Sequence, residues 1–141
     1  MNGGRKSILL VDNNVTNLTM GKNMLRVAYN VIPVPSAAKM FEVLSDFMPD
    51  LILLDVEMPE MNGFEAIKQL KADDRYFNIP VMFLTTKIGE SEVRTGLELG
   101  AADFIIKPFS AMLLLKRIER ELQIVGLKKE LQELRKRYEN G

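Results

Sequence analysis

The sequence predicts an α/β protein with a doubly wound parallel sheet of five strands and five covering helices. Short aliphatic runs alternate with amphipathic helical patterns along the chain, and residues 51–54 (LILL) are apolar at every position. A strand that is apolar on both faces suits a sheet with helices on both sides. Regular alternation of strands and helices is typical of parallel βα units.

Each expected strand is a short run of large aliphatic residues. The runs occupy residues 7–11, 31–34, 51–54, 81–84 and 103–106. Pro80 stands at the start of the fourth run, where a missing backbone N–H is tolerated. At 141 residues the chain fits one domain.

The helical patterns fill the intervals between the strands. They cover residues 14–28, 36–47, 63–71 and 90–99, and a fifth begins near Ser110. Ser36 is a suitable N-cap residue for the second helix. Gly100 stands at the position after the fourth helix where glycine commonly ends a helix.

Composition narrows the classes of function. The 141 residues carry 19 Lys+Arg and 19 Asp+Glu, so no net charge favours nucleic acid or an anionic membrane. The chain has no cysteine and no histidine, so any metal must be held by oxygen, which points to Mg²⁺. No stretch approaches the roughly 18 apolar residues of a membrane span. The N-terminus also lacks the pattern of a signal peptide, and we expect a cytoplasmic protein.

The fifth helical pattern continues past Leu122, into a predicted extension over residues 123–141. Its apolar residues follow the a/d positions of a heptad: Ile124, Leu127, Leu131, Leu134 and Tyr138. In that register Glu130 is at g and Arg135 at e, so a parallel partner helix could pair them.

Two interpretations of this extension stay open. One is a linker or dimerisation helix that forms a coiled coil, giving a homodimer. The other is a long amphipathic helix that packs on its own domain or stays exposed, since the stripe covers only about two and a half heptads. Gly126 also weakens the helix by roughly 1 kcal/mol.

Polar residues follow four of the expected strands. They are Asp12 and Asn13 after the first strand, Asp55 after the third, Thr85 and Thr86 after the fourth, and Lys107 after the fifth. The carboxyl ends of parallel strands meet at one edge of the sheet, where ligands bind in this fold class. We therefore expect these side chains to converge.

The converging residues suit a magnesium site and phosphoryl chemistry. Neighbouring carboxylates raise each other's pKa unless a cation neutralises them. Mg²⁺ usually takes one or two carboxylates, water and a phosphate oxygen. Asp12, Asn13, Asp55 and a main-chain carbonyl after Asp55 could provide such a site. A neutralised Asp55 would accept a phosphoryl group, with Thr85 and Lys107 placed to bind the phosphate.

Four segments resemble the receiver domain of two-component response regulators. They are LLVDNN (residues 9–14), LLDVEMPEMNG (53–63), LTT (84–86) and GAADFIIKPF (100–109). Each segment alone is a weak or moderate signal, but four in this order and at these separations are highly specific. The resemblance covers roughly residues 5–122 and implies a flavodoxin-like sheet with strand order 2-1-3-4-5.

The resemblance also implies roles for the converging residues. Asp55 would be phosphorylated by the phosphohistidine of a sensor histidine kinase with Mg²⁺ bound. Asp12 would be the acid of the metal site, the main-chain carbonyl of Glu57 a further metal ligand, and Lys107 the salt-bridge partner of the phosphate. Such a domain is a phosphoacceptor that assists its own phosphorylation and slow dephosphorylation; it is not an enzyme with a separate substrate.

The same resemblance implies a conformational switch. Thr85 would turn toward the phosphate, and the ring of Phe104 would move inward behind it. The surface of the fourth helix, fifth strand and fifth helix would then control dimerisation or a downstream output partner. The Lys107–Pro108 peptide bond is expected to be cis.

Asn13 departs from the family pattern, which usually has a second acid at this position. An amide oxygen can bind Mg²⁺ but brings no charge. We therefore expect weaker Mg²⁺ binding than in a receiver with two acids. The alternative is that Asn13 only begins the following turn.

The resemblance also implies that the side chains two positions after Asp55 and two after Thr85, here Glu57 and Lys87, flank the path of the hydrolytic water. Their opposite charges could pair across the mouth of the site and slow phosphate loss. The alternative is that both are solvated surface charges.

The sequence leaves two alternative functions open: a binding module and a phosphatase. Asn13 would also suit a pseudo-receiver that binds partners without phosphorylation. An aspartate-nucleophile phosphatase of the haloacid dehalogenase type also places an aspartate after an apolar strand. That family needs a second aspartate two residues later, where this chain has Glu57.

Overall fold

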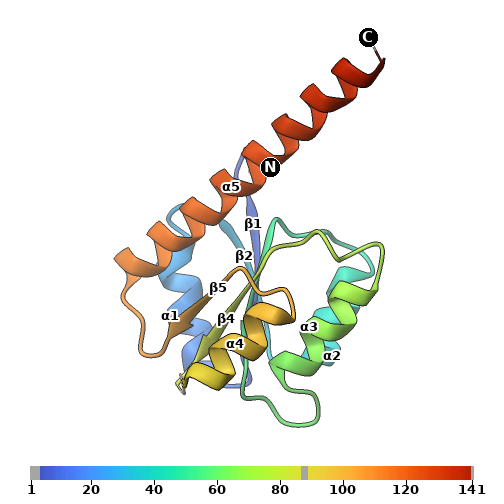
Figure 1. The fold of residues 1–141 in the computed structure, drawn as a ribbon. Helices are drawn as coiled ribbons and strands as arrows, with labels where there is room; N and C mark the ends of the chain where they lie inside the picture. The colour runs from blue at the N-terminus through green and yellow to red at the C-terminus, as the bar shows by residue number, and fades with distance from the viewer. Residues whose placement is uncertain (1–3, 87–88, 141) are drawn as a thin grey trace.

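Five strands and five helices alternate along the chain in the computed structural model, which describes residues 4–86 and 89–140 (Figure 1). The strands are β1 (Ser7–Val11), β2 (Asn30–Val34), β3 (Leu51–Asp55), β4 (Val81–Thr85) and β5 (Asp103–Ile106). The helices are α1 (Val15–Leu25), α2 (Ala37–Leu44), α3 (Gly63–Ala72), α4 (Glu90–Glu98) and α5 (Ala111–Asn140).

All the strand pairs are parallel, and the strand order is β2-β1-β3-β4-β5. The predicted doubly wound, flavodoxin-like sheet is therefore confirmed. The chain order reverses direction at β1, so β1 and β3 are neighbours although α1, β2 and α2 separate them in sequence. Such a reversal opens a crevice at the carboxyl ends of the strands.

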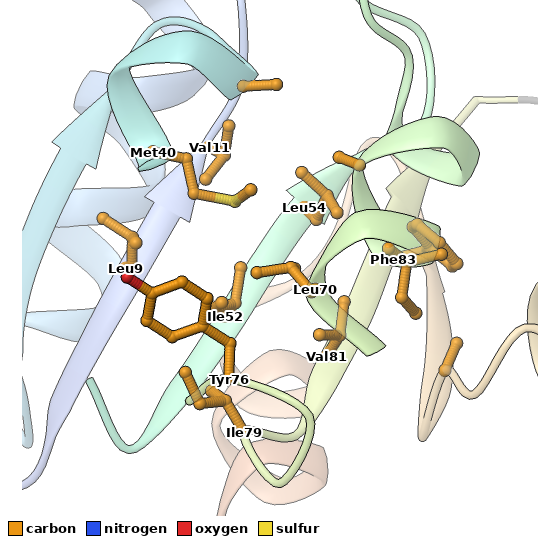
Figure 2. Packing of buried hydrophobic residues seen from close by; sticks show 14 of the residues in the cluster. Leu9, Val11, Met40, Ile52, Leu54, Leu70, Tyr76, Ile79, Val81 and Phe83 are labelled. Carbon is orange, nitrogen blue, oxygen red and sulfur yellow. The ribbon is translucent and has the colours of Figure 1, made fainter. Parts of the chain in front are cut away.

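Two hydrophobic cores cover the two faces of the sheet. Alternate residues of each central strand enter opposite cores, so that in β1 Leu9 contacts one core and Leu10 the other. The first core includes residues of α2, α3 and α4, and the second includes residues of α1 and α5. Figure 2 shows part of the first core, where Leu9, Val11, Ile52, Leu54, Val81 and Phe83 of the sheet lie near Met40, Leu70, Tyr76 and Ile79.

Helix bounds differ from the sequence-based expectation mainly at the ends. Asn14 is the N-cap of α1 and accepts a hydrogen bond from the backbone N–H of Asn17. The helix ends at Leu25, three residues before the predicted end at residue 28, because the backbone N–H groups of both Ala28 and Tyr29 bond to the carbonyl of Leu25. The second helix likewise ends at Leu44, before the predicted 47, while its predicted N-cap Ser36 is confirmed.

The last helix, α5, is continuous over 30 residues. Its first part packs on the sheet through Leu114 and Ile118, and its second part extends beyond the rest of the molecule (Figure 1).

Gly100 follows the end of α4, as predicted. Its φ of 108° is a backbone conformation that glycine adopts readily after a helix. Among the residues that the structure describes, no helix is long and apolar enough to cross a bilayer.

Candidate functional site

The predicted site residues converge at the carboxyl edge of the sheet. Asp12 follows β1, Lys107 follows β5, and Asp55 and Thr85 are the last residues of β3 and β4. From the sequence, Asp55 and Thr85 were expected just beyond the ends of their strands. In the structure both residues still pair with the neighbouring strand. Asp12, Asp55 and Thr85 are at most 2% exposed and are the buried polar residues of the described core.

A small pocket opens beside these residues. It has a volume of about 190 Å³ and is lined by Asp12, Asn13, Asn14, Asn17, Asp55, Glu57, Thr86 and Lys107. These residues come from the end of β3, from the start of α1 and from the segments that follow β1, β3, β4 and β5, which lie far apart in sequence. The parallel sheet brings them together because the carboxyl ends of its strands share one edge.

Lys107 bridges the two buried aspartates. Its Nζ lies 2.7 Å from Asp12 Oδ2 and 3.2 Å from Asp55 Oδ1, and its side chain is largely buried. The peptide bond between Lys107 and Pro108 is cis, as predicted. One ammonium group thus faces two carboxylates, which leaves the buried cluster with a net negative charge.

Asn13 contacts the carboxylate of Asp55. With its carboxamide nitrogen directed inward, Asn13 donates hydrogen bonds to Asp55 Oδ2 (3.1 Å) and to the main-chain oxygen of Glu57 (3.1 Å). If the Asn13 carboxamide is rotated by 180°, its oxygen instead of its nitrogen lies beside Asp55 Oδ2 and the main-chain oxygen of Glu57. Asn13 is therefore part of the site, and the interpretation that it only begins a turn does not describe its contacts.

The loop after β3 is held close to Asp55. The backbone N–H of Glu57 donates to Asp55 Oδ1 (3.2 Å), and the N–H of Gly63 donates to the carbonyl of Val56 (2.9 Å). A Cβ atom at Gly63 would meet the main-chain oxygen of Asp55 at 2.5 Å. Only glycine allows α3 to begin so near the end of β3, so Gly63 is needed for this approach.

Burial raises the pKa of the Asp55 carboxyl to about 6, and the negative charge of Asp12 adds to the rise. The Lys107 ammonium and the N–H of Glu57 oppose this shift. The physical cause is that the low-polarity edge of the sheet disfavours a second negative charge beside Asp12. A cation at the site would relieve this penalty.

The donors at the pocket fit a hard divalent cation. Asp12 Oδ2 is buried, and no donor among residues 4–86 and 89–140 is aligned to form a hydrogen bond with it, although the Lys107 ammonium lies 2.7 Å away. Asp55 Oδ2, the main-chain oxygen of Glu57 and the Asn13 carboxamide lie on the same side of the pocket. Carboxylate, carbonyl and amide oxygens are the ligands that Mg²⁺ prefers, and it usually needs one or two carboxylates.

Glu57 has a side-chain partner that the sequence analysis missed. The hydroxyl of Thr86 donates to Glu57 Oε1 over 3.0 Å. The predicted partner, Lys87, lies outside the described residues. Thr86 carried no signal for this contact because the two residues are 29 positions apart.

Phe104 is buried behind the site. Its ring stacks on Phe83 with a centroid distance of 5.2 Å, and Phe64 meets Phe83 edge-on at the same distance. A Cβ atom at Gly96 of α4 would lie 2.4 Å from the Phe104 ring, so the ring fills the space of a missing side chain. Phe104 thus connects β5 with α4, and its predicted role in a switch pair with Thr85 stays a prediction.

These observations define a doubly wound α/β protein with two aspartates and a lysine at the carboxyl edge of its sheet. Residues 8–119 match the family of the response regulator receiver domain. The chain belongs to this family, whose members are phosphoacceptors of two-component systems that interact with histidine kinases and output domains.

Named relatives support the assignment. The chain is 38% identical over 117 residues to a probable cyclic di-GMP phosphodiesterase of Vibrio cholerae, covering 83% of this chain and 26% of that protein. It is 35% identical over 115 residues to the chemotaxis protein CheY1 of Helicobacter pylori, covering 79% and 93% of the two chains. The chain therefore spans about a quarter of one relative and nearly all of the other.

A solved receiver domain has the same architecture. The receiver domain of a sensor histidine kinase from Pseudomonas aeruginosa superposes with a TM-score of 0.78 at 26% identity, covering 85% of this chain and 99% of that chain. That structure has a magnesium ion coordinated in its active-site cleft. The family match ends at residue 119 and so does not include the extension of α5.

Proposed function

We propose that Asp55 accepts a phosphoryl group from the phosphohistidine of a sensor histidine kinase, and that Mg²⁺ is required. The observation that carries this proposal is the convergence of Asp12, Asp55 and Lys107 in one buried cluster at the sheet edge. Family membership adds the expectation of a phosphoacceptor. The aspartate-nucleophile phosphatase is not favoured, because the chain matches the receiver family.

The two oxygens of Asp55 have different surroundings. Oδ1 lies 3.2 Å from the Lys107 ammonium, and Oδ2 lies 3.1 Å from the Asn13 carboxamide. Oδ2 is therefore the oxygen for the metal side of the pocket, and Oδ1 is the attacking oxygen. In the transfer, Asp55 Oδ1 forms the new bond to phosphorus while the phosphorus–nitrogen bond of the donor breaks, and the electron pair stays on the imidazole nitrogen, which takes up a proton.

Asp12, Asn13, Asp55 and the main-chain oxygen of Glu57 would hold the metal. Mg²⁺ bound there supplies positive charge that neutralises the aspartates and the incoming phosphoryl oxygens. Lys107 keeps its ammonium beside Asp55 Oδ1, where it cancels charge on the transferred group. We expect the hydroxyl of Thr85, the last residue of the neighbouring strand β4, to bind the phosphate.

Phosphorylation would change the surface formed by α4, β5 and α5. Thr85 would move toward the phosphate, and Phe104 would adjust behind it. Phe104 packs against Gly96 of α4 and is adjacent to Asp103, which pairs with Arg117 of α5. A shift of the Phe104 ring would therefore change the packing of both α4 and α5. The altered surface would bind an output domain or partner protein.

Intact-mass measurement tests the proposal directly. The protein is incubated with acetyl phosphate and Mg²⁺, and we expect one phosphoryl group to be added. Asp55→Asn should abolish the adduct, and the exposed acid variant Asp46→Asn should retain it. An adduct that persists in Asp55→Asn would place the acceptor elsewhere, and a folded parent protein that gains no adduct would favour the pseudo-receiver.

A further inference from the structure

The part of α5 beyond the domain is a helix without neighbours on one apolar face. Residues 126–140 are exposed, and this segment extends away from the sheet in Figure 1. Its large apolar side chains are nevertheless restricted to one stripe, with exposed fractions of 65% for Leu127, 52% for Leu131, 51% for Leu134 and 91% for Tyr138. A solvated helix has no need for such a stripe, so the pattern indicates a partner.

The stripe is separate from the face that packs on the sheet. The buried residues of α5 are Leu114 and Ile118, and the helix flank nearest the domain continues through Val125 and Lys129, which line hollows beside it. At 100° per residue, the stripe centred on Leu131 lies more than a quarter of a turn from that flank. The domain therefore leaves Leu127, Leu131, Leu134 and Tyr138 uncovered, whereas Ile124, one turn earlier, lies at the edge of the hollow beside the domain.

We propose that the stripe is the interface of a parallel two-stranded coiled coil with a second copy of this chain. The argument for a second copy is charge complementarity within the helix itself. With Ile124, Leu131 and Tyr138 at a, and Leu127 and Leu134 at d, Glu130 occupies g and Arg135 the following e position. In a parallel pair these two residues face each other, and the twofold axis generates the contact twice.

The antiparallel arrangement is disfavoured by the same charges. Aligning Leu127 with Leu131 of an antiparallel copy brings the g positions together and the e positions together. Glu130 then lies beside Glu130 of the second copy, and Lys128 lies beside Lys128. Both contacts are repulsive, whereas the parallel arrangement has the attractive contact between Glu130 and Arg135.

The domain determines where this coiled coil begins. The next a and d positions toward the sheet are Arg117 and Arg120, and both are engaged by Asp103 of β5 at 3.4 and 3.3 Å. Arg117 also donates to the carbonyl of Phe104 over 2.7 Å. The apolar seam therefore starts at Ile124. Because α5 is already nucleated on the domain, the short seam does not have to offset the cost of starting a helix.

Disulfide trapping tests both the contact and its direction, since the chain has no cysteine. In Leu134→Cys the two thiols of a parallel dimer face each other, and the oxidant diamide should link them into a covalent dimer. Lys136→Cys, at position f opposite the seam and outside the hollows beside the domain, is the matched control and should stay monomeric under the same conditions. Efficient linkage of Leu127→Cys only to Leu131→Cys in a mixture would indicate an antiparallel pair and overturn the proposal.

Sedimentation of the unmodified chain supplies the second test and does not depend on phosphorylation. We expect a monomer–dimer equilibrium that Leu131→Lys weakens about a hundredfold or more, while Gln132→Lys leaves it unchanged. Glu130→Arg should weaken it about tenfold, and Glu130→Arg with Arg135→Glu should restore it. A parent chain that stays monomeric at its solubility limit, or a Leu131→Lys variant that dimerises normally, would show that the stripe serves another purpose.

Discussion

The Asn13 carboxamide lies 3.1 Å from Asp55 Oδ2, at a position where the family usually has a second acid. Without a bound metal, the Asn13 side-chain nitrogen can donate to Asp55 and to the main-chain oxygen of Glu57. These N–H groups give the Asp55 carboxylate part of the stabilisation that a cation would give. The same group turned around offers an oxygen to a metal. The charge at position 13 should therefore affect both Mg²⁺ binding and the ionisation of Asp55.

Asn13→Asp should tighten Mg²⁺ binding. The added charge would attract the cation by about a few kcal/mol at an effective dielectric near 20, part of which is lost to desolvation, so we expect about ten- to a hundredfold tighter binding. Calorimetric titration with MgCl₂ measures this. The control is Asn23→Asp, because Asn23 is exposed on α1 and does not line the pocket, so the same added charge lies away from the metal site. Equal affinities in Asn13→Asp and the parent would refute this account of Asn13.

Asp55 should make the metal-free protein less stable as the pH rises through about 6. Its folded-state pKa, about 6, is raised from 3.8, so the carboxyl's contribution to stability is complete below pH 3.8 and is lost above pH 6. Asp55→Asn should therefore be more stable than the parent by up to about 3 kcal/mol at pH 7 to 8.

Urea unfolding of both proteins across pH, with a chelator present, measures this difference. The two stabilities should converge near pH 4, where Asp55 is largely protonated, and Mg²⁺ should reduce the difference at pH 7. A difference that does not vary with pH would mean that ionisation of Asp55 has no part in it.

Gly96→Ala should disturb the packing behind the site. The new methyl group would lie 2.4 Å from the Phe104 ring, and such overpacking costs about 1–3 kcal/mol, which outweighs the gain in helix propensity. Thermal unfolding measures the loss. Adding Phe104→Leu should recover stability in the Gly96→Ala background, and no recovery would mean that the clash is elsewhere.

Gly126→Ala should have the opposite effect. No heavy atom other than its own helix neighbours lies within 4 Å of the position of the new Cβ, so only the propensity changes. The substitution should stabilise the local helix by about 1 kcal/mol. Amide hydrogen exchange in residues 123–140 is the appropriate measurement, because local opening of this segment need not unfold the domain. Faster exchange in the variant would contradict the prediction.

Removing charge from the mouth of the site should shorten the lifetime of the phosphorylated form. Glu57 is held at the pocket by the Thr86 hydroxyl, 3.0 Å from Oε1. We expect the double variant Glu57→Ala/Lys87→Ala to lose phosphate faster than the parent, as measured by the decay of the phosphorylated mass. Thr86→Val removes the hydrogen bond but keeps both charges, so it separates positioning from charge. Unchanged decay in the double variant would leave Glu57 and Lys87 as solvated charges.

The sequence by itself determined the order of the elements and the identity of the main site residues. Five apolar runs specify five strands, and the runs of β1, β3 and β4 are buried almost throughout because helices cover both faces of the sheet. Asp12, Asp55, Thr85 and Lys107 could be placed together without a structure because parallel strands share their carboxyl edge. Helix ends were less accurate: α1 and α2 both end three residues early, since local hydrogen bonds in the turns decide where a helix stops.

Only the tertiary structure decided how these residues contact one another. The bridge from Lys107 to both aspartates, the bond between Thr86 and Glu57, and the fit of Phe104 against Gly96 join segments that are distant in sequence. No local pattern encodes these contacts, because each depends on the spacing of neighbouring strands and on side-chain orientation within a few tenths of an ångström. The raised pKa of Asp55 follows from that arrangement, since burial and a nearby charge exist only after folding.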